Sequence, residues 1–561
     1  MKDGLFPVLV IVAAIVISFI ASKVTKANKR SSLRLKISSQ WGKKAERKYT
    51  DEDFSSISSF YKNVSELGEN RNIIDDITWY DLDMDNVFKR LNSTQSNIGE
   101  EYLYNLLRRP SFDQTVLEER DRLVNLFGNK KLIREKLQFI FASLGKAKFV
   151  NISDYFFGKA EHYSSNVFIY KLLSAAALIS PFLLIFNIGF GFTMIIITFI
   201  INMLIHYRLK NIIGAQLEIL AYIIGMTSSA KKIVKENIPE LKQYNAILEE
   251  NIRDIKKITR KAFYIFSVNN GDIFTEYFRI ILLREAIDYE SIMNTIYKHN
   301  EQFKKVYETI GLLDSMISIA SFRKSISYYT VPKLNTGSDN RALDFKEIYH
   351  PLISDPVTNS LSTSDSVLLT GSNASGKSTF LKTVALNAIF AQTIYTCLAK
   401  EYSSGRFMVF SSMALKDNLF NNESYFIVEI KSLKRILDYL NEDVPCLCFI
   451  DEVLRGTNTV ERVSASSQIL YSLSKSNCLC FAATHDIELT NILNKNYKNF
   501  HFQEKIEDNK IIFDYKLYEG KSMTRNAIKL LGIMGYEDKV VKLAEDRANK
   551  FISQGKWDII G

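Results

Sequence analysis

The chain has 561 residues, too many for a single hydrophobic core, so we expect two or three folded units. Apolar residues make up 47% and charged residues 24%, a balance typical of globular proteins rather than of disordered or fibrous ones. The net charge is +10, but residues 23–48 contain ten Lys or Arg and one Glu, so the rest of the chain is almost neutral. The overall charge therefore gives little support for a broad nucleic-acid surface outside that segment.

The N-terminal segment is predicted to be a membrane anchor. Residues 4–22 are uncharged and strongly apolar, and this length is just sufficient to cross a bilayer. A cleaved signal peptide is the alternative, but the residues before this stretch have almost no net charge and no Ala-x-Ala site follows it. A juxtamembrane segment, residues 23–75, follows. We expect its basic part, residues 23–48, to mark the cytoplasmic side and contact anionic lipid, unless it is only a solvated tail.

A second apolar region occupies residues 167–207. No Asp, Glu, Lys or Arg occurs in residues 172–205, a stretch too long for one straight membrane span. The turn residues Asn187-Ile-Gly-Phe-Gly191 divide it into two short helices, at about 167–186 and 190–207. A buried core hairpin is the alternative, but the segment lacks a polar face. The sequence thus predicts a transmembrane hairpin with both ends in the cytoplasm.

The segments on either side of the hairpin, residues 76–166 and 208–328, are expected to be mostly helical. Apolar positions recur three and four apart after Leu217, and charges dominate residues 231–261. Long helices with so many charges are typical of an elongated bundle. We interpret the two segments as parts of one helical lever, whose first helix after the hairpin can continue directly out of the last membrane span.

Residues 329–561 alternate short apolar strands with helices, which predicts an α/β domain with a parallel sheet. A strand at 366–370 runs into Gly-x4-Gly-Lys-Ser and then a helix beginning at Phe380. The glycines let backbone N–H groups face phosphate oxygens, and the helix N-terminus favours negative charge. In this motif Lys377 reaches the β- and γ-phosphates of ATP, and the Ser378 hydroxyl ligates Mg²⁺. The predicted nucleotide-binding residues of the loop are Gly371, Ser372, Asn373, Ala374, Ser375, Gly376, Lys377, Ser378 and Thr379.

Two further strands end in residues suited to nucleotide chemistry. The strand from Cys446 ends in Asp451, suited to coordinating Mg²⁺, and in Glu452, suited to orienting or deprotonating the attacking water. The strand from Cys478 ends at His485, which beside a γ-phosphate can sense nucleotide state and polarise the water. Surface acids and a structural histidine are the alternatives. We therefore predict Lys377, Glu452 and His485 as catalytic residues and Ser378 and Asp451 as metal ligands.

Four of the five cysteines form two Cys-x-Cys pairs, which begin at Cys446 and Cys478. Alternate residues of a strand share a face, so each pair has a spacing that can hold a metal ion. Both pairs lie in apolar runs typical of buried strands, and we therefore favour packing in the core over zinc binding. Nothing in the spacing suggests a disulfide framework, which fits a reducing cytoplasm.

These motifs resemble those of the MutS family of DNA mismatch-repair ATPases. The run Asp451-Glu-Val-Leu-Arg-Gly-Thr-Asn-Thr459 looks like the family's Asp-Glu-Ile-Gly-Arg-Gly-Thr-Ser-Thr. The run Ala483-Thr-His-Asp-Ile-Glu-Leu-Thr490 is similar to its Ala-Thr-His-Tyr-Phe-Glu-Leu-Thr. The resemblance covers about residues 76–150 and 208–550. It includes His350-Pro351 before the P-loop and Ser424-Tyr-Phe-Ile-Val-Glu429 after it.

The resemblance implies a P-loop ATPase domain with an ABC- or MutS-like parallel sheet, C-terminal to a helical lever. It also implies ATP and Mg²⁺ as cofactors, a homodimer with two composite ATP sites, and binding to DNA, either structure-selective or non-specific. His350 would contact the nucleotide, and Ser424 would reach the γ-phosphate of the partner's site. The chain departs from the family pattern where Asn421-Asn-Glu-Ser424 replaces Ser-Gly-x-Ser, and where Ser372 and Ser375 replace Pro and Gly.

The N-terminal region also departs from the family. The lever begins by about residue 76, which leaves no room for a mismatch-reading domain with its Phe-x-Glu motif, and we interpret Phe274-Thr-Glu276 and Phe502-Gln-Glu504 as chance matches. We expect a multi-pass membrane protein with three spans and a cytoplasmic MutS-like ATPase domain. A membrane scaffold or mechanical ATPase without a DNA role is the alternative. A transporter-type ATPase would need a Leu-Ser-Gly-Gly-Gln motif, which the sequence lacks.

Overall fold

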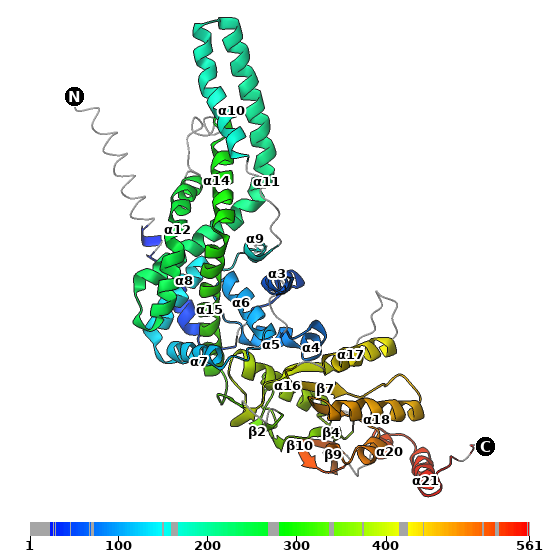
Figure 1. Ribbon diagram of the computed structural model, residues 1–561. Coiled ribbons are helices and arrows are strands. Elements are labelled where there is room, and N and C mark those ends of the chain that lie inside the picture. Colours follow the sequence, from blue (N-terminus) through cyan, green and yellow to red (C-terminus); the bar gives the residue numbers. More distant parts are fainter. Residues whose placement is uncertain are drawn as a thin grey trace. The chain divides into compact units, whose positions relative to one another are not determined.

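The chain forms two compact units in a computed structural model (Figure 1). Unit 1 comprises Met1–Arg71, Leu91–Leu106 and Arg122–Ser325, and unit 2 comprises Asn72–Arg90, Leu107–Asp121 and Ile326–Gly561. The anchor predicted at residues 4–22 lies outside the described part of the chain. The structure describes residues 23–25, 27–28, 30–44, 47–66, 68, 72–147, 151–158, 166–267, 280–335, 341–372, 375–413, 425–440, 443–507, 510–521, 527–557 and 559.

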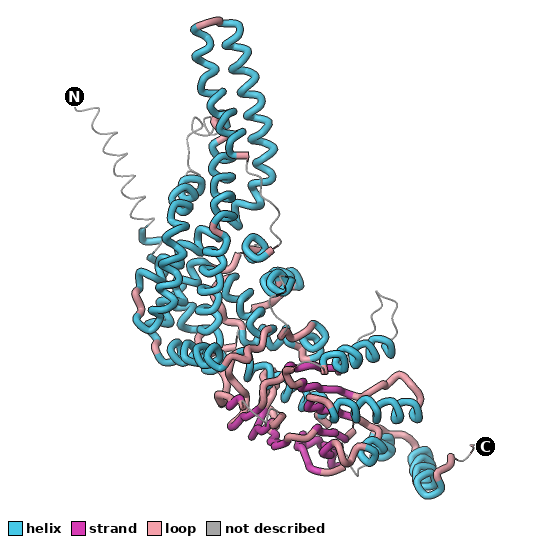
Figure 2. The backbone as a smooth tube through the Cα atoms, in the orientation of Figure 1, coloured by secondary structure: helices cyan, strands magenta, loops and turns pink. Residues whose placement is uncertain are grey.

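Unit 1 is built from helices, whereas the strands belong to unit 2 (Figure 2). Helices α6 and α7 begin or end in unit 2 because the unit boundaries fall within them. The elements that lie wholly or partly in unit 1 are α2 (Asp51–Ile57), α3 (Ser59–Glu66), α6 (Asn97–Arg108), α7 (Gln114–Asn129), α8 (Lys131–Leu144), α9 (Ser153–Phe157), α10 (Val167–Ile179), η1 (Ser180–Ile185), α11 (Ile188–Glu236), η2 (Pro239–Leu241), α12 (Lys242–Ser267), α14 (Arg284–Lys298) and α15 (Asn300–Lys324).

Helix α15 is the buried centre of unit 1. Most of its residues from Phe303 to Arg323 are buried, and α11 and α12 pack against it. Around Tyr307 the core is aromatic, with the ring centroids of Phe60 and Phe157 at 5.0 and 5.4 Å. The Tyr307 hydroxyl donates a hydrogen bond of 2.6 Å to the carboxylate of Glu101, so a polar group in this core is satisfied by a partner.

The start of α6 crosses α15 at very short range. The Asp314 carboxylate accepts the backbone N–H groups of Gln95 and Ser96 at 3.1 and 3.0 Å, and the Ser96 hydroxyl at 2.6 Å. These bonds satisfy donors at the beginning of the helix that have no partner within it. A Cβ atom on Gly99 would lie only 2.2 Å from an Asp314 carboxylate oxygen. The approach of the two helices therefore requires glycine at this position.

The second apolar region forms a helical hairpin, as predicted. Chain reversal occurs at Phe186 and Asn187, and the Asn187 side chain caps α11 by accepting the N–H of Phe190 at 3.1 Å. Because of this cap, α11 begins at Ile188, slightly earlier than the sequence suggested. The helix continues without a break to Glu236, which confirms that it runs directly from the hairpin into the bundle.

Two helices of this hairpin are long and apolar enough to cross a membrane, Val167–Ile185 and Ile188–Arg208. Only 17% of the most apolar stretch of the first helix and 11% of that of the second are buried within the structure. The alternative of a buried core hairpin is therefore not supported, because a core hairpin would be covered by protein.

Part of the basic N-terminal segment is folded onto unit 1. Residues 30–40 are helical, and the Ile37 side chain is 4% exposed. The guanidinium carbon of Arg134, in α8, lies 3.7 Å from the ring centroid of Trp41. Cation–π contacts of this kind fix both side chains. The alternative of a free, solvated tail therefore does not hold for this part of the segment.

Unit 2 contains the predicted α/β domain. Its six-stranded sheet has the order β10-β9-β4-β8-β7-β6, in which every neighbouring pair is parallel except β9 and β10. A second sheet has the order β1-β5-β2-β3. The elements are α4 (Asp76–Asp81), α5 (Met84–Leu91), β1 (Lys333–Leu334), β2 (Leu343–Ile348), β3 (Asn359–Thr363), β4 (Ser366–Thr370), α16 (Lys377–Thr393), β5 (Glu401–Ser404), β6 (Met408–Ser412), α17 (Tyr425–Tyr439), β7 (Cys446–Asp451), α18 (Thr459–Lys475), β8 (Cys478–Ala483), α19 (Ile487–Ile492), β9 (Tyr497–Glu507), β10 (Lys510–Glu519), α20 (Ala527–Ile533) and α21 (Asp538–Gln554).

Helices cover both faces of the six-stranded sheet. In β7, Cys446, Cys448 and Ile450 point to one face, where they pack with Leu433 of α17 and Leu470 of α18. Helix α16, which follows the P-loop, packs against β6, β7 and β8 and is almost entirely buried. Strands covered on both faces are apolar throughout, as expected for a parallel sheet.

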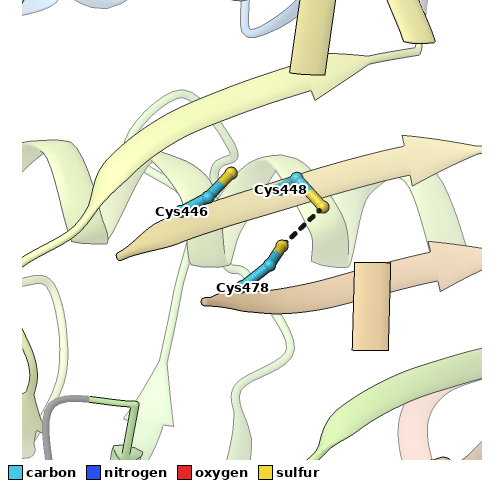
Figure 3. Close-up of side chains that lie close together, drawn as sticks. All are labelled: Cys446, Cys448 and Cys478. Carbon is cyan, nitrogen blue, oxygen red and sulfur yellow. Dashed lines mark hydrogen bonds between the residues drawn. The ribbon is translucent and has the colours of Figure 1, made fainter. Parts of the chain in front are cut away.

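Four cysteines lie on one face of this sheet. Cys446 pairs with Cys478 and Cys448 with Cys480 across the parallel strands β7 and β8. The sulfur atoms of Cys446, Cys448 and Cys478 all lie within 4.8 Å of one another (Figure 3). All five cysteines are buried and none is in a disulfide. The prediction that they pack in the core is confirmed, while the close spacing keeps a thiophilic metal as the alternative.

The close crossing of α6 and α15 predicts that Gly99→Ala is destabilising. The added methyl group would overlap the Asp314 carboxylate, so one of the two helices must shift. This shift should lower the free energy of unfolding by about 1–3 kcal/mol. Gly128→Ala is the matched control, because this exposed glycine of α7 has no atom within 4 Å of the added Cβ. Thermal unfolding of both variants in detergent measures the difference. Equal stability of the two variants would contradict the close approach.

Burial of the thiols predicts their reactivity. In the folded protein all five cysteines should react slowly with a thiol reagent, because burial keeps the reagent away from the sulfur atoms. In denaturant all five should react rapidly. Counting modified thiols over time measures both states, and metal analysis of the same sample tests the metal alternative. A cysteine that reacts at once in the folded protein would show that its burial is wrong.

Candidate functional site

The P-loop connects β4 to α16 through a backbone shape that favours glycine. Gly371 and Gly376 have φ angles of 148° and 104°, in the region that other residues rarely adopt. A Cβ atom on Gly371 would lie 2.8 Å from the Phe502 carbonyl oxygen. Helix α16 begins at Lys377, three residues earlier than the sequence suggested, so its first turn starts directly at the loop. The predicted residues Asn373 and Ala374 lie outside the described part of the chain.

Lys377 points back into the loop. Its ammonium group donates to the carbonyl oxygens of Gly371 and Ser372 at 2.7 and 2.8 Å, and lies 3.5 Å from Nε2 of His485. Burial lowers the pKa of Lys377, and the nearby carboxylates of Asp451 and Glu452 act in the opposite direction. A cation held here suits phosphate oxygens that approach the loop.

The two predicted metal ligands lie together. The Ser378 hydroxyl, in the first turn of α16, donates a hydrogen bond to the carboxylate of Asp451, the last residue of β7. A hydroxyl and a carboxylate are oxygen ligands of the kind that Mg²⁺ takes beside a phosphate. Thr379 is the next residue of α16 and is exposed.

Glu452 and His485 also meet at this edge of the sheet. Nε2 of His485 lies 3.0 Å from the Glu452 carboxylate, which also accepts a hydrogen bond from Nε of Arg455. Burial alone would raise the pKa of Glu452, but the hydrogen bonds and charges of Arg455 and His485 lower it to about 2. Glu452 is therefore ionised near neutral pH, the state required of a group that orients or deprotonates water.

Two residues that the sequence analysis did not select for the site, Glu504 and Tyr515, contact the P-loop. The Ser372 hydroxyl donates to the buried carboxylate of Glu504 in β9 at 2.7 Å. The side chain of Tyr515 lies against Gly376, where an added Cβ would be 3.1 Å from the ring. Among the described residues, the buried Ser375 hydroxyl has no hydrogen-bond partner. An unpaired buried hydroxyl beside a buried lysine and two glycines fits a phosphate group.

Arg462, in the first turns of α18, holds the loop that carries His485. Its guanidinium binds both carboxylate oxygens of Asp486 at 2.9 and 2.6 Å. The N–H of Asp486 in turn donates to the Thr484 hydroxyl at 3.0 Å. A bidentate arginine–carboxylate pair fixes orientation as well as distance. In the sequence, the only sign of this pair is Asp486, the acid directly after His485. No nucleotide-binding motif singles out that acid.

Two predicted site residues are not brought into this cluster by any contact that the structure describes. His350 follows β2, and its Nδ1 accepts the N–H of Leu352 at 3.2 Å. Burial lowers the pKa of His350 to about 4, and the positive charge of Lys382 in α16 acts in the same direction. His350 is therefore neutral near pH 7. Ser424 lies outside the described residues, so its predicted contact with a partner's site remains a prediction.

The part of the chain that carries this cluster is similar to known proteins. Residues 367–552 match the family model of MutS domain V. The match begins within β4 and includes the P-loop, β7, β8 and the site residues described above except His350. MutS domain V is a P-loop ATPase-type domain, which agrees with the observed sheet and loop.

Curated relatives align with slightly less than half of the chain. MutS protein homolog 4 from Homo sapiens is 31% identical over 253 residues, 42% of this chain and 26% of its own length. The DNA mismatch repair protein MutS of Methanosarcina mazei is 28% identical over 287 residues, 48% of this chain and 31% of the relative. The protein of the same name from Thermotoga petrophila is 29% identical over 283 residues, 47% of this chain and 35% of the relative.

The chain thus spans about a quarter to a third of the length of these relatives, and the similarity is confined to less than half of the chain. The matched residues 367–552 include most of β4, the P-loop, β7 and β8, the elements that carry the site. The C-terminal part of this chain is therefore similar to MutS domain V, a P-loop ATPase-type domain.

Proposed function

We propose that this protein binds ATP with Mg²⁺ and hydrolyses it at the P-loop cluster of unit 2. The observation that carries the proposal is the meeting of Lys377, Ser378 with Asp451, and Glu452 with His485 at one edge of a parallel sheet. Lys377 and the loop N–H groups hold the β- and γ-phosphates, and Ser378 and Asp451 hold the metal ion. Bound Mg²⁺ neutralises the charge that develops on the phosphates.

In the proposed reaction, Glu452 orients the attacking water and accepts its proton. Its carboxylate lies between Arg455 and His485, so a water placed beside it would also be near the histidine. His485 lies close to Lys377 as well, which suits a residue that responds to the γ-phosphate. His350 is proposed as a further nucleotide contact and Ser424 as a contact across a homodimer, as the family resemblance implies.

The second part of the proposal is that the protein is held in a membrane, with its ATPase domain in the cytoplasm. The two hairpin helices are apolar and largely uncovered by protein, and water would be a poor solvent for that surface. The segment at residues 4–22 would supply a third span, and the basic residues 23–48 would lie near anionic lipid. The proposed chain order is anchor 4–22, juxtamembrane segment 23–75, lever 76–166, hairpin 167–207, lever 208–328 and ATPase domain 329–561.

The third part of the proposal is a homodimer that binds DNA. Its support is the similarity to proteins named for DNA mismatch repair. The nearly neutral charge outside residues 23–48 favours the alternative, a membrane scaffold or mechanical ATPase that does not bind DNA. The two candidates share the ATPase site and differ in whether DNA changes its rate.

ATPase activity is tested first with Lys377→Ala. This change removes the ammonium group proposed to bind the β- and γ-phosphates. It should lower the ATPase rate of the detergent-purified protein by about 100-fold or more. Lys434→Ala is the control, because this exposed lysine lies on α17 and pairs with Asp438. Equal rates for Lys377→Ala and the wild type would remove the ATPase proposal.

The same assay separates the two candidates when duplex, mismatched and branched DNA are added. A change of rate that weakens with salt supports DNA binding. An ATPase rate that no DNA changes, but that lipid changes, supports the membrane scaffold.

Arg462 is expected to act through His485 and not through the nucleotide. Arg462→Ala should therefore lower kcat about 10-fold while the KM for ATP changes little, because the loop loses its bidentate support. Lys475→Ala, at the other end of α18, is the matched control. A large rise in KM with unchanged kcat would assign Arg462 to nucleotide binding instead.

A further inference from the structure

A cavity of about 730 Å³ opens in unit 1, whereas the P-loop cluster belongs to unit 2. Its walls come from the basic helix at residues 30–40 and the residues after it, from the loop before α6, and from α8. This volume is in the range of small-molecule sites in proteins, about 300–1,000 Å³. Among the residues that line it, the charged ones are all cationic: Lys36, Lys43, Lys44, Arg47 and Lys146.

The positive charge of this cavity is only partly neutralised. Glu100 lies beneath it and binds Arg47 at 2.7 Å and Lys146 at 2.5 Å. Within the described part of the chain, the ammonium groups of Lys36, Lys43 and Lys44 have no hydrogen bond or ion pair. Three lysines around one cavity, without an acidic partner among the described residues, repel each other and attract an anion.

A buried amide gives a second, independent indication of a ligand. Gln138 of α8 lines the cavity and is only 4% exposed, yet its amide oxygen has no hydrogen-bond partner among the described residues. Buried polar groups in folded proteins nearly always have a partner, so an unpaired one at a cavity wall suggests that something else supplies it. A rotation of the terminal amide by 180° would present its N–H₂ group to an anion, and both orientations are open because no described residue binds the amide.

We propose that this cavity binds a small phosphate-bearing polyanion. Lysine ammonium groups bind phosphate as point charges, and three of them match a ligand that carries several negative charges. The Gln138 amide, which also lines the cavity, is suited to one of the remaining phosphate oxygens. The residues of this site belong to unit 1 and include none of the P-loop cluster.

The phosphate groups can come from a soluble compound or from a lipid headgroup. A neighbouring cavity of about 830 Å³ shares Leu33 and Ile37 with the first and is lined by Leu35, Leu132 and Phe139. Leu35 and Leu132 are 72% and 76% exposed. An acyl chain would cover that apolar surface, whereas a soluble anion would leave it uncovered. The two sources therefore predict different effects of changing Leu132.

Titration with inorganic tripolyphosphate, in a Lys377→Ala background that weakens the P-loop site, tests the proposal on the full-length protein in detergent. Replacing Lys36, Lys43 and Lys44 together by Gln should weaken binding about 10-fold or more. The matched control replaces three exposed lysines of the same unit, Lys62, Lys298 and Lys305, by Gln. Gln138→Leu should weaken binding about 3-fold, because it removes one neutral donor. With Lys377 intact, the cavity variants should keep the wild-type ATPase rate, which also shows that they fold.

Reconstitution in lipid discs identifies the source. If discs of anionic phospholipid block tripolyphosphate binding while neutral discs do not, and Leu132→Gln relieves the block, the cavity holds a lipid headgroup. If tripolyphosphate binds equally in both discs, the ligand is soluble. No binding in detergent or neutral discs, or equal weakening by the cavity and control triple variants, would overturn the proposal.

Discussion

The register of three parallel strands controls the candidate site. Leu369 of β4 and Asp451 of β7 are both level with Ala483 of β8, the strand between them. The backbone bonds at this level, from Thr484 to Leu369 and from Glu452 to Ala483, are 2.9 and 3.0 Å long. Because parallel strands end at the same edge of a sheet, this register places a loop, an acid and a histidine from distant parts of the chain side by side.

The same arrangement explains why so many charges are tolerated in a small volume. Lys377 donates to loop carbonyls, Glu452 is paired with Arg455 and His485, and Ser372 donates to Glu504. Each of these contacts satisfies a group that would otherwise be buried without a partner. Binding of a phosphate requires some of them to be exchanged. The side chain of Arg455 is 52% exposed, so its contact with Glu452 is among the less costly ones to release.

In unit 1, buried polar contacts join the helices at two places along α15. At one level Asp314 of α15 accepts the backbone N–H groups that precede α6, and Gly99 permits the close crossing. At another level Tyr307 donates to Glu101. Such bonds have direction, so they fix the rotation of helices that apolar packing alone would leave adjustable. Helix α11 then extends from this bundle into the hairpin without a break.

The local pattern of the sequence was sufficient for the nucleotide motifs, the hairpin and the buried strands. Each of these depends on neighbours in the chain. Gly371 and Gly376 bracket a loop, residues 172–205 lack charge, and Cys446 to Ile450 form an uninterrupted apolar run. Periodicity and turn chemistry are local properties, and a single sequence reports them directly.

Only the tertiary structure decided which side chains meet. Glu504 joins Ser372, and Arg462 joins Asp486, across strands and helices that no local pattern connects. The basic N-terminal segment is a further example of a contact that local pattern does not reveal. Its charges dominate the composition, but Leu33, Ile37 and Trp41 recur every four residues and fold it onto α8, where it lines a cavity. Local sequence determines which elements form, whereas side-chain partners depend on packing between elements distant in the chain, which no window of sequence contains.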